Sequence, residues 1–166
     1  MVGPEPASGA GNPIGGPPVQ LAPVLVRQLL DHAWRESPRE CCGLLTQAGG
    51  ADLRYHPARN VAASPARYEV HPDDLLAVLT AAEASGSTLW GLFHSHVRHD
   101  AFPSRLDREH AFYPEAIYLI LSLWAEAAVG KGFRAFGAAV VRGYRLVDGA
   151  VEEVPLALGA DGPPSG

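Results

Sequence analysis

Two histidines and an aspartate stand at a spacing that suits a metal ion. His94 and His96 flank one residue at the end of an apolar run, and Asp107 follows after ten intervening residues. Side chains at positions i and i+2 of a strand project to the same face, so both imidazoles can reach one ion while Ser95 points away. Three nitrogen and oxygen ligands leave the fourth position of a tetrahedral zinc ion open for water, as in catalytic zinc sites. The spacing therefore predicts a hydrolytic zinc centre.

A glutamate and a serine could complete such a site. Hydrolysis needs a carboxylate that takes the proton of the attacking water without binding the metal, and a donor for the oxyanion that develops. Glu40 stands at the start of the apolar run 41–45, and Ser104 lies three residues before Asp107, on the same turn of a predicted helix. Glu40 and Ser104 are therefore the candidates for these two roles.

Each of these residues also has a simpler explanation. Ser104 and Asp107 match the capping box of a helix, a histidine on an apolar strand is usually a core residue, and a glutamate at a strand end is usually solvated. His99 could join His94 and His96 in an alternative triad of ligands, although a loop histidine is more often in contact with water. The joint pattern His-x-His-x7-Ser-x2-Asp favours the metal site.

Helices and short strands must position these side chains. Apolar residues at helical spacing predict a helix from Pro23 up to Pro38 and another from Pro72 to Gly86, besides the short helix capped by Ser104. The buried positions predicted on the two long helices are Val26, Leu29, Leu30, Ala33, Trp34, Leu75, Leu76, Leu79 and Ala82. Apolar runs predict central strands over 88–93 and 116–123, and further strands over 41–46, 53–61, 134–141 and 144–147, the last two turning at Gly143. This order predicts an α/β or α+β fold, a sheet with helices on its faces.

Length and composition indicate one domain. The chain has 166 residues, of which 47% are hydrophobic and 19% charged, enough for a single core. Residues 1–19 and 158–166 are rich in glycine and proline and read as flexible tails around a domain of residues 20–157. Lysine and arginine total 13 against 18 acidic residues, so we expect no binding to nucleic acid.

The sequence also predicts a compartment. The N-terminus has no positively charged region followed by an apolar one, so we expect no secretory signal and a cytoplasmic protein. The longest apolar stretch, 116–129, is interrupted by Glu126 and is too short to span a membrane. Cys41 and Cys42 are adjacent, so we expect reduced thiols rather than a loop-closing disulfide, and a redox role would need an exposed thiol of low pKa.

At these motifs the sequence resembles the JAMM (MPN-plus) metalloprotease family. The signature of that family is a glutamate followed by His-x-His-x10-Asp with an embedded Ser-x-x-Asp. The resemblance covers residues 20–148 and is greatest to the short bacterial branch, whose pattern residues 37–45, 68–72 and 89–96 also match. One departure is Val97, because the family usually has proline after the second histidine.

The resemblance implies both a fold and a site. The family fold is a central mixed β-sheet flanked by helices and is related to the cytidine-deaminase fold. By resemblance, His94, His96 and Asp107 hold one Zn²⁺ ion, Glu40 is the general base, and Ser104 holds the oxyanion.

The resemblance also implies a reaction, the hydrolysis of a peptide or isopeptide bond after the C-terminal glycine of a ubiquitin-like or sulfur-carrier protein. Water would be activated by zinc and Glu40. The alternative is a non-catalytic MPN-type scaffold that binds ubiquitin-like partners, although such members generally lack the ligands that are present here. Deamination is disfavoured, because the chain has no His-x-Glu motif with Pro-Cys-x-x-Cys.

Overall fold

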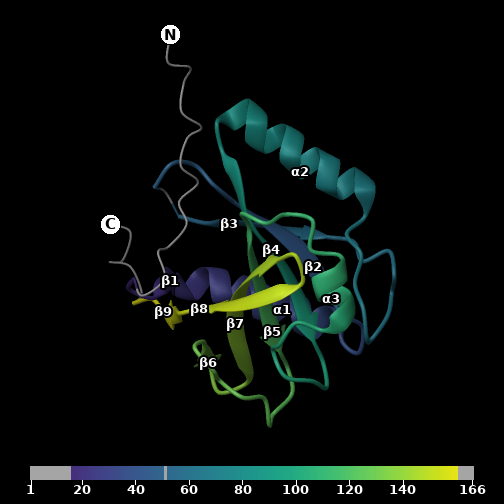
Figure 1. Ribbon diagram of the computed structural model, residues 1–166, viewed down its shortest axis with the longest axis vertical. Helices are drawn as coiled ribbons and strands as arrows, with labels where there is room; N and C mark the ends of the chain where they lie inside the picture. Colours follow the sequence, from purple (N-terminus) through teal and green to yellow (C-terminus); the bar gives the residue numbers. More distant parts are fainter. Residues whose placement is uncertain (1–15, 51, 161–166) are drawn as a thin grey trace.

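A mixed sheet of seven strands forms the centre of the computed structural model, which describes residues 16–50 and 52–160 (Figure 1). The strands lie in the order β3 (Arg54–Ala58), β2 (Cys42–Gln47), β4 (Thr88–His96), β5 (Ile117–Ser122), β7 (Ala139–Val147) and β6 (Phe133–Ala135), and β8 (Ala150–Val154) also pairs with β7. Strands β4 and β5 are parallel, whereas the other pairs are antiparallel. The predicted α+β class with a central mixed sheet is confirmed.

The central strands are apolar over most of their length because both faces of the sheet are covered. Along β5, Leu119 and Leu121 belong to the core cluster that includes helix α1 (Pro23–Glu36). The alternate residues Tyr118 and Ile120 belong to a separate cluster on the opposite face. All six residues of β5 are buried, as are the last six of β4. A continuous apolar run is therefore a sound indicator of the middle of this sheet.

The two long helices lie on opposite faces of the sheet, at the positions in the sequence that were predicted. Helix α1 packs against the face that carries Leu45, and helix α2 (Pro72–Ser85) packs against the face that carries Leu44. Trp34 and Leu76 were predicted to be buried, which is wrong, because 53% and 66% of their surfaces are exposed. Each helix touches the sheet along a narrower stripe than its apolar residues suggest.

The connection between β4 and β5 positions the third predicted ligand. Parallel neighbours cannot be joined by a hairpin, so the chain must cross over from the carboxyl end of β4 to the start of β5. Residues 97–116 make this crossover and contain helix α3 (Arg105–Glu109). Asp107 of α3 is thereby brought back over the end of β4.

The predicted turn at Gly143 is wrong. Gly143 lies within β7, where an added Cβ would be 3.2 Å from a methyl carbon of Leu156 and 3.3 Å from one of Leu119. Glycine at this position therefore allows close packing of neighbouring side chains and does not form a turn. The turn lies further along, at Asp148 and Gly149, which both have positive φ angles and connect β7 to β8.

Two other differences concern the ends of the domain and one strand. Strands β1 (Val19–Leu21) and β9 (Leu156–Leu158) pair in parallel as a second small sheet, which was not predicted because the pairing joins distant parts of the chain. Most of the two predicted tails lies outside the described residues, although Val19 and Leu158 at their inner ends belong to this small sheet. The strand predicted over 53–61 is shorter and spans only Arg54–Ala58.

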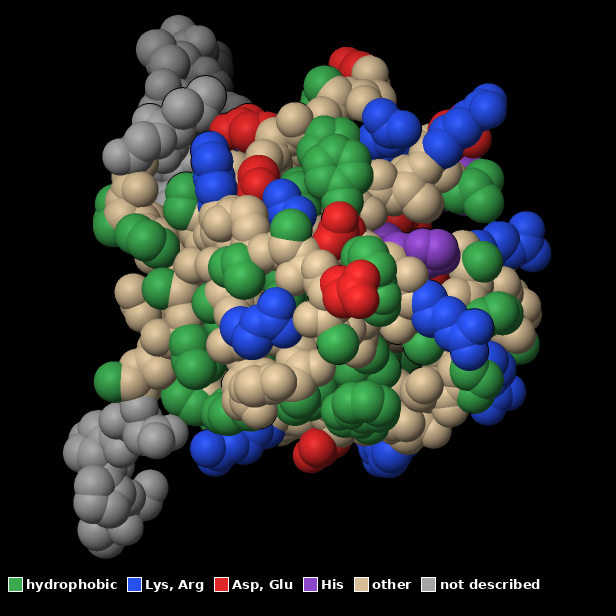
Figure 2. Space-filling model, turned by 90° about the horizontal axis from the view of Figure 1, so that it is seen from below, with side chains coloured by type: hydrophobic (Ala, Val, Ile, Leu, Met, Phe, Trp, Pro, Cys, Tyr) green, Lys and Arg blue, Asp and Glu red, His purple; other side chains and the backbone are tan. Residues whose placement is uncertain are grey.

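The surface alone does not mark a site. Figure 2 shows acidic, basic and apolar side chains interspersed over one face of the molecule. Within residues 16–50 and 52–160, the helices are too short or too polar to cross a membrane. The buried polar residues are therefore the better guide to function, and several of them meet at the end of β4.

Candidate metal centre

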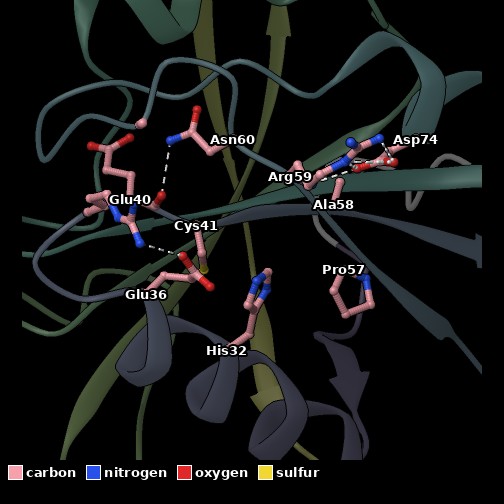
Figure 3. Close-up of a pocket in the computed structure, with 11 residues that line it drawn as sticks. His32, Glu36, Glu40, Cys41, Pro57, Ala58, Arg59, Asn60 and Asp74 are labelled. Carbon is pink, nitrogen blue, oxygen red and sulfur yellow. Dashed lines mark hydrogen bonds and ion pairs between the residues drawn. The ribbon is translucent and has the colours of Figure 1, made fainter.

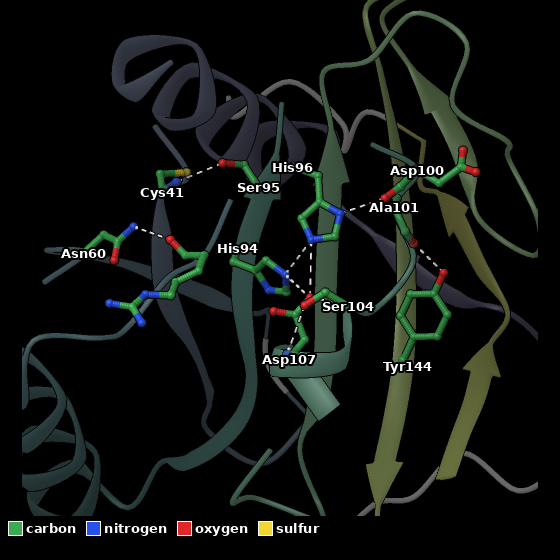
Figure 4. Close-up of polar contacts among 11 residues, drawn as sticks. Cys41, Asn60, His94, Ser95, His96, Asp100, Ala101, Ser104, Asp107 and Tyr144 are labelled. Atoms are coloured by element: carbon green, nitrogen blue, oxygen red, sulfur yellow. Dashed lines mark hydrogen bonds and ion pairs between the residues drawn. The ribbon is translucent and has the colours of Figure 1, made fainter. Parts of the chain in front are cut away.

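Three buried side-chain atoms converge at the carboxyl end of β4 (Figure 4). His94 Nε2 lies 3.1 Å from His96 Nε2, and Asp107 Oδ2 lies 3.1 Å and 3.3 Å from these two nitrogens. Metal–ligand bonds of 2.0–2.1 Å in a tetrahedron require ligand atoms about 3.3 Å apart. The three atoms therefore form one face of a tetrahedron of the size that a zinc-like ion needs, and these residues could hold a metal ion.

The same serine and aspartate also cap helix α3. Ser104 Oγ accepts the backbone N–H of Asp107 at 3.1 Å, and Asp107 Oδ2 accepts the backbone N–H of Ser104 at 2.8 Å. The simpler explanation of this pair is therefore also correct. The capping box fixes the Asp107 carboxylate so that the oxygen bound to Ser104 N–H also faces the two imidazoles.

Ser95 points away from the two histidines, as its position in the strand predicts. Its Oγ accepts the backbone N–H of Cys41 at 2.8 Å, and its own N–H donates to the carbonyl of Cys41 at 3.0 Å. The residue between the two ligands is thus bound twice to the residue that follows Glu40.

A backbone carbonyl sets the tautomer of His96. His96 Nδ1 lies 2.7 Å from the carbonyl oxygen of Asp100. A carbonyl can only accept, so Nδ1 carries the proton, and the neutral ring presents the lone pair of Nε2 to the site. This is the orientation that a metal-binding histidine requires.

Two further hydrogen bonds hold the loop 97–103 that contains this carbonyl. The hydroxyl of Ser122 donates to the carbonyl of His99, and the hydroxyl of Tyr144 donates to the carbonyl of Ala101. The carbonyl groups of the residues before and after Asp100 are thus attached to the sheet.

The other histidine is covered by an aromatic ring. Tyr68 stacks on His94 with the ring centroids 4.2 Å apart and the planes 17° from parallel. His94 Nδ1 is buried and has no hydrogen-bond partner in the described part of the chain. The orientation of His94 is therefore set by this packing and by the contact of its Nε2 with Asp107.

The charges of the three predicted ligands are strongly coupled. Burial lowers the pKa of His94, although Asp107 partly offsets this effect. Burial opposes protonation of His96 as well, but the hydrogen bonds to Asp107 and to the carbonyl of Asp100, together with the charges of Glu40 and Asp107, outweigh burial and raise the pKa. Burial alone would raise the pKa of Asp107, yet the two histidines and the N–H of Ser104 hold it well below its usual range. Asp107 is therefore an anion that faces two imidazoles.

Glu40 is a buried carboxyl group next to this centre. Only 3% of its surface is exposed, and its Oε2 atom has no hydrogen-bond partner among the residues described. Burial raises its pKa to about 8, and the interactions with His96 and Asp107 that modify this pKa have opposite signs. A carboxyl group with a pKa near neutrality can both accept and return a proton.

A groove of about 370 Å³ runs beside Asp107. Its walls come from the segment before α2, from α3 and from the chain that follows α3. The residues that line it are mostly apolar or aromatic, and they include Tyr68, Val70, Leu75, Leu92, Leu106, Phe112 and Tyr113. An extended peptide could lie in such a groove with one end at the metal centre.

The alternative triad with His99 does not form. Among the residues that the structure describes, only the ligand atoms of His94, His96 and Asp107 converge. His99 is exposed, and its carbonyl group rather than its ring is held by the sheet.

Sequence analysis did not single out Tyr68, Asp100 or Tyr144. Tyr68 belongs to a matched family motif, but nothing in the sequence indicates that its ring reaches His94. Asp100 acts through its main chain, which any residue could supply. Tyr144 lies in a strand and meets the loop only through the fold.

The chain matches the model of the prokaryotic homologs of the JAB domain over residues 22–136, a range that includes all five predicted site residues. It is 40% identical over 125 residues to a desampylase from Haloferax volcanii, which covers 68% of this chain and 88% of the desampylase. It is 34% identical over 134 residues to the CysO-cysteine peptidase of Mycobacterium tuberculosis, which covers 80% of this chain and 85% of the peptidase.

Solved structures show the same architecture. The solution structure of a protein from Desulfitobacterium hafniense superposes with a TM-score of 0.70 at 29% identity, covering 86% of this chain and 94% of that protein. The crystal structure of a JAB1/MPN domain protein from Archaeoglobus fulgidus gives a TM-score of 0.50 at 16% identity, covering 84% and 98%. The second likeness supports the fold alone.

Proposed function

The chain belongs to the prokaryotic JAB family of JAMM/MPN proteins, and on this premise we propose that it is a zinc-dependent protease of protein conjugates. Its substrate is a ubiquitin-like or sulfur-carrier protein, cleaved at a peptide or isopeptide bond after the C-terminal glycine. Relatives named desampylase and CysO-cysteine peptidase support this substrate class. The observation that carries the proposal is the triangle of three ligand atoms beside a buried glutamate. We assign the activity to residues 20–157 and to the cytoplasm.

The donor set supports zinc as the metal. Two imidazole nitrogens and one carboxylate oxygen are common zinc ligands, and their separations suit tetrahedral coordination with one position left open. When bound, zinc lowers the pKa of a coordinated water molecule to about 7 and polarises the scissile carbonyl group.

Glu40 moves the proton in this proposal. Its carboxylate takes a proton from the attacking water as the new carbon–oxygen bond forms, and it returns the proton to the nitrogen of the leaving group as the carbon–nitrogen bond breaks. The absence of a hydrogen bond to Oε2 within the described chain supports this role, because no protein group occupies the lone pairs that would accept the proton.

Ser104 binds the oxyanion in this proposal. Its oxygen accepts the N–H of Asp107 in the capping box, so the hydroxyl hydrogen remains available for a second partner. A hydroxyl donor held by a helix terminus is preorganised for the negative charge that develops on the carbonyl oxygen.

Intact-mass spectrometry tests the proposal. A ubiquitin-like sulfur carrier with a short C-terminal extension is incubated with zinc-loaded protein, with chelator-treated protein and with Glu40→Gln. The matched control is Glu36→Gln. Glu36 is the last residue of helix α1, and its partly exposed carboxylate pairs with Arg39. We expect loss of the extension after Gly-Gly only with the zinc-loaded wild type and the control.

Two results would contradict the proposal. Cleavage that survives both the chelator and Glu40→Gln would exclude zinc-assisted hydrolysis with Glu40 as base. Stoichiometric zinc with carrier binding but no cleavage would favour the non-catalytic scaffold.

A further inference from the structure

The side chain of Asn60 holds together the loop 60–70, which lies next to Glu40. Its Oδ1 accepts the N–H groups of Ala62 and Glu69 at 3.0 and 2.9 Å. Its Nδ2 donates to the carbonyl groups of Glu40 and Arg67 at 3.0 and 3.2 Å, the first of which is drawn in Figure 3. All four hydrogen-bonding positions of the amide are used, and each partner is a backbone group. Two donors at one end and two acceptors at the other also fix which way the amide points.

One of these bonds involves Glu40. Its carbonyl accepts from Asn60, and its N–H donates to the carbonyl of Ser64 in the same loop at 2.9 Å. The Oε2 atom of Glu40, by contrast, has no partner within the described chain. The direction of this carboxyl group is therefore set through its backbone, which the loop holds on both sides.

Two others of the four bonds concern Tyr68. Asn60 binds the carbonyl of Arg67 and the N–H of Glu69, which are the peptide groups immediately before and after Tyr68. The ring of Tyr68 stacks on His94 and lines the groove beside Asp107. One side chain thus links the residue that we assign as the base to the residue that covers a predicted metal ligand.

We propose that Asn60 is a positioning residue for the reaction, which aims Glu40 and holds Tyr68 against His94. The part of this inference that concerns catalysis rests on the proposed function. Asn60 touches neither the substrate nor the metal and acts through the backbone groups that it binds. The loop 60–70 is accordingly a preformed wall of the site.

Asn60→Asp is the sharpest variant. It keeps the size of the side chain and an oxygen for the two N–H groups, but it replaces the amide donor with an oxygen that faces two carbonyl groups. Asn60→Ala removes all four bonds. The matched control is Ser64→Ala, which removes a different hydrogen bond of the same loop, the one from Ala66 N–H to Ser64 Oγ at 3.1 Å.

Kinetics and zinc titration are measured on the three variants. We expect Asn60→Asp and Asn60→Ala to lower kcat by about 10- to 100-fold, because small errors in placing a catalytic group cost this much. KM and zinc affinity should change by a smaller factor than kcat, since Asn60 reaches the substrate groove and His94 only through Tyr68. Ser64→Ala should retain the wild-type kcat. A kcat within twofold of wild type for both Asn60 variants would overturn the proposal.

Nuclear magnetic resonance tests the geometry without activity. In the wild type, the Asn60 side-chain amide protons and the Glu69 N–H should exchange slowly, and the ring protons of His94 should be shifted upfield by Tyr68. We expect Asn60→Asp to weaken this upfield shift and Ser64→Ala to preserve it. Fast exchange of the Asn60 amide protons in the wild type would overturn the proposal even if the variants fail to fold. If the wild type cleaves no carrier, the proposed function fails, while these spectra still decide the placement of Glu40 and Tyr68 by Asn60.

Discussion

Ser104 stands at the N-terminus of α3 and could serve the helix, the reaction or both. Its backbone is extended, with φ −68° and ψ 171°, and its Oγ accepts the N–H of Asp107. Replacing an N-cap serine by alanine typically costs about 0.5–2 kcal/mol of stability, whereas glycine costs only a few tenths. Loss of an oxyanion donor typically lowers kcat by about 10²- to 10³-fold. Stability and catalysis should therefore respond differently to the two substitutions.

We expect Ser104→Ala and Ser104→Gly to lower kcat equally, by about two to three orders of magnitude, because both remove the hydroxyl. Only Ser104→Ala should lower the free energy of unfolding by about 1 kcal/mol. Ser104→Thr keeps both the hydroxyl and the cap and serves as the matched control.

The assay combines steady-state cleavage of a carrier conjugate, zinc content and urea unfolding of the zinc-free proteins. Zinc should remain stoichiometric in all three variants, because Ser104 is not a predicted ligand. A kcat near wild type in Ser104→Gly, with a loss only in Ser104→Ala, would refute the oxyanion role and leave Ser104 as a helix cap.

Three further predictions concern the metal and its surroundings. Asp107→Asn should reduce zinc content well below one ion per chain, and it should lower the stability of the zinc-free protein near neutral pH, since the amide still accepts the N–H of Ser104 but lacks the negative charge that the two histidines favour; stoichiometric zinc by elemental analysis would contradict this. Tyr144→Phe should cost about 1–3 kcal/mol in urea unfolding, because a buried carbonyl loses its partner, and should weaken zinc binding about tenfold. The control is Tyr118→Phe, because Tyr118 is buried and lies opposite Tyr144 in the pairing of β5 with β7. This substitution should leave zinc affinity unchanged, and equal effects of the two substitutions would show that Tyr144 has no special link to the site. In the zinc-free protein, the pKa of Glu40 is near 8 in the folded state, so the unfolded chain ionises this group at lower pH than the folded protein does. The wild type should therefore lose stability relative to Glu40→Gln as the pH rises from about 4.5 to 8. A difference in unfolding free energy that does not vary with pH would refute the buried state of Glu40.

The parts of the site that could be predicted are those set by local geometry. His94 and His96 share a face because a strand repeats every two residues, and Ser104 and Asp107 meet because a capping box spans one turn. The central strands were identifiable because strands buried on both faces are apolar throughout. These features depend on residues that are close in sequence, so the spacing of those residues is enough to predict them.

The parts that could not be predicted depend on distant partners. Gly143 reads as a turn in isolation, but it lies in β7, where it pairs with β5 and where side chains from β5 and β9 would contact an added Cβ closely. Trp34 and Leu76 have the spacing of buried residues, yet the helices present them to solvent. Asn60 has one partner two residues away, which is typical of a local turn, but its other partners come from distant positions.

The residue between the two histidines explains how the proposed base and the predicted ligands are held in fixed relative positions. Ser95 binds the N–H and the carbonyl of Cys41, the residue that follows Glu40, and Cys42 stands opposite His94 in the pairing of β2 with β4. Glu40 is thus attached on one side to the strand that carries His94 and His96 and on the other side, through Asn60, to the loop 60–70. A small hydroxyl side chain suits position 95 because it accepts a backbone N–H within the sheet and leaves the opposite face to the imidazoles. Displacement of β2 relative to β4 would therefore separate the carboxyl group from the metal centre before it disturbed the centre itself.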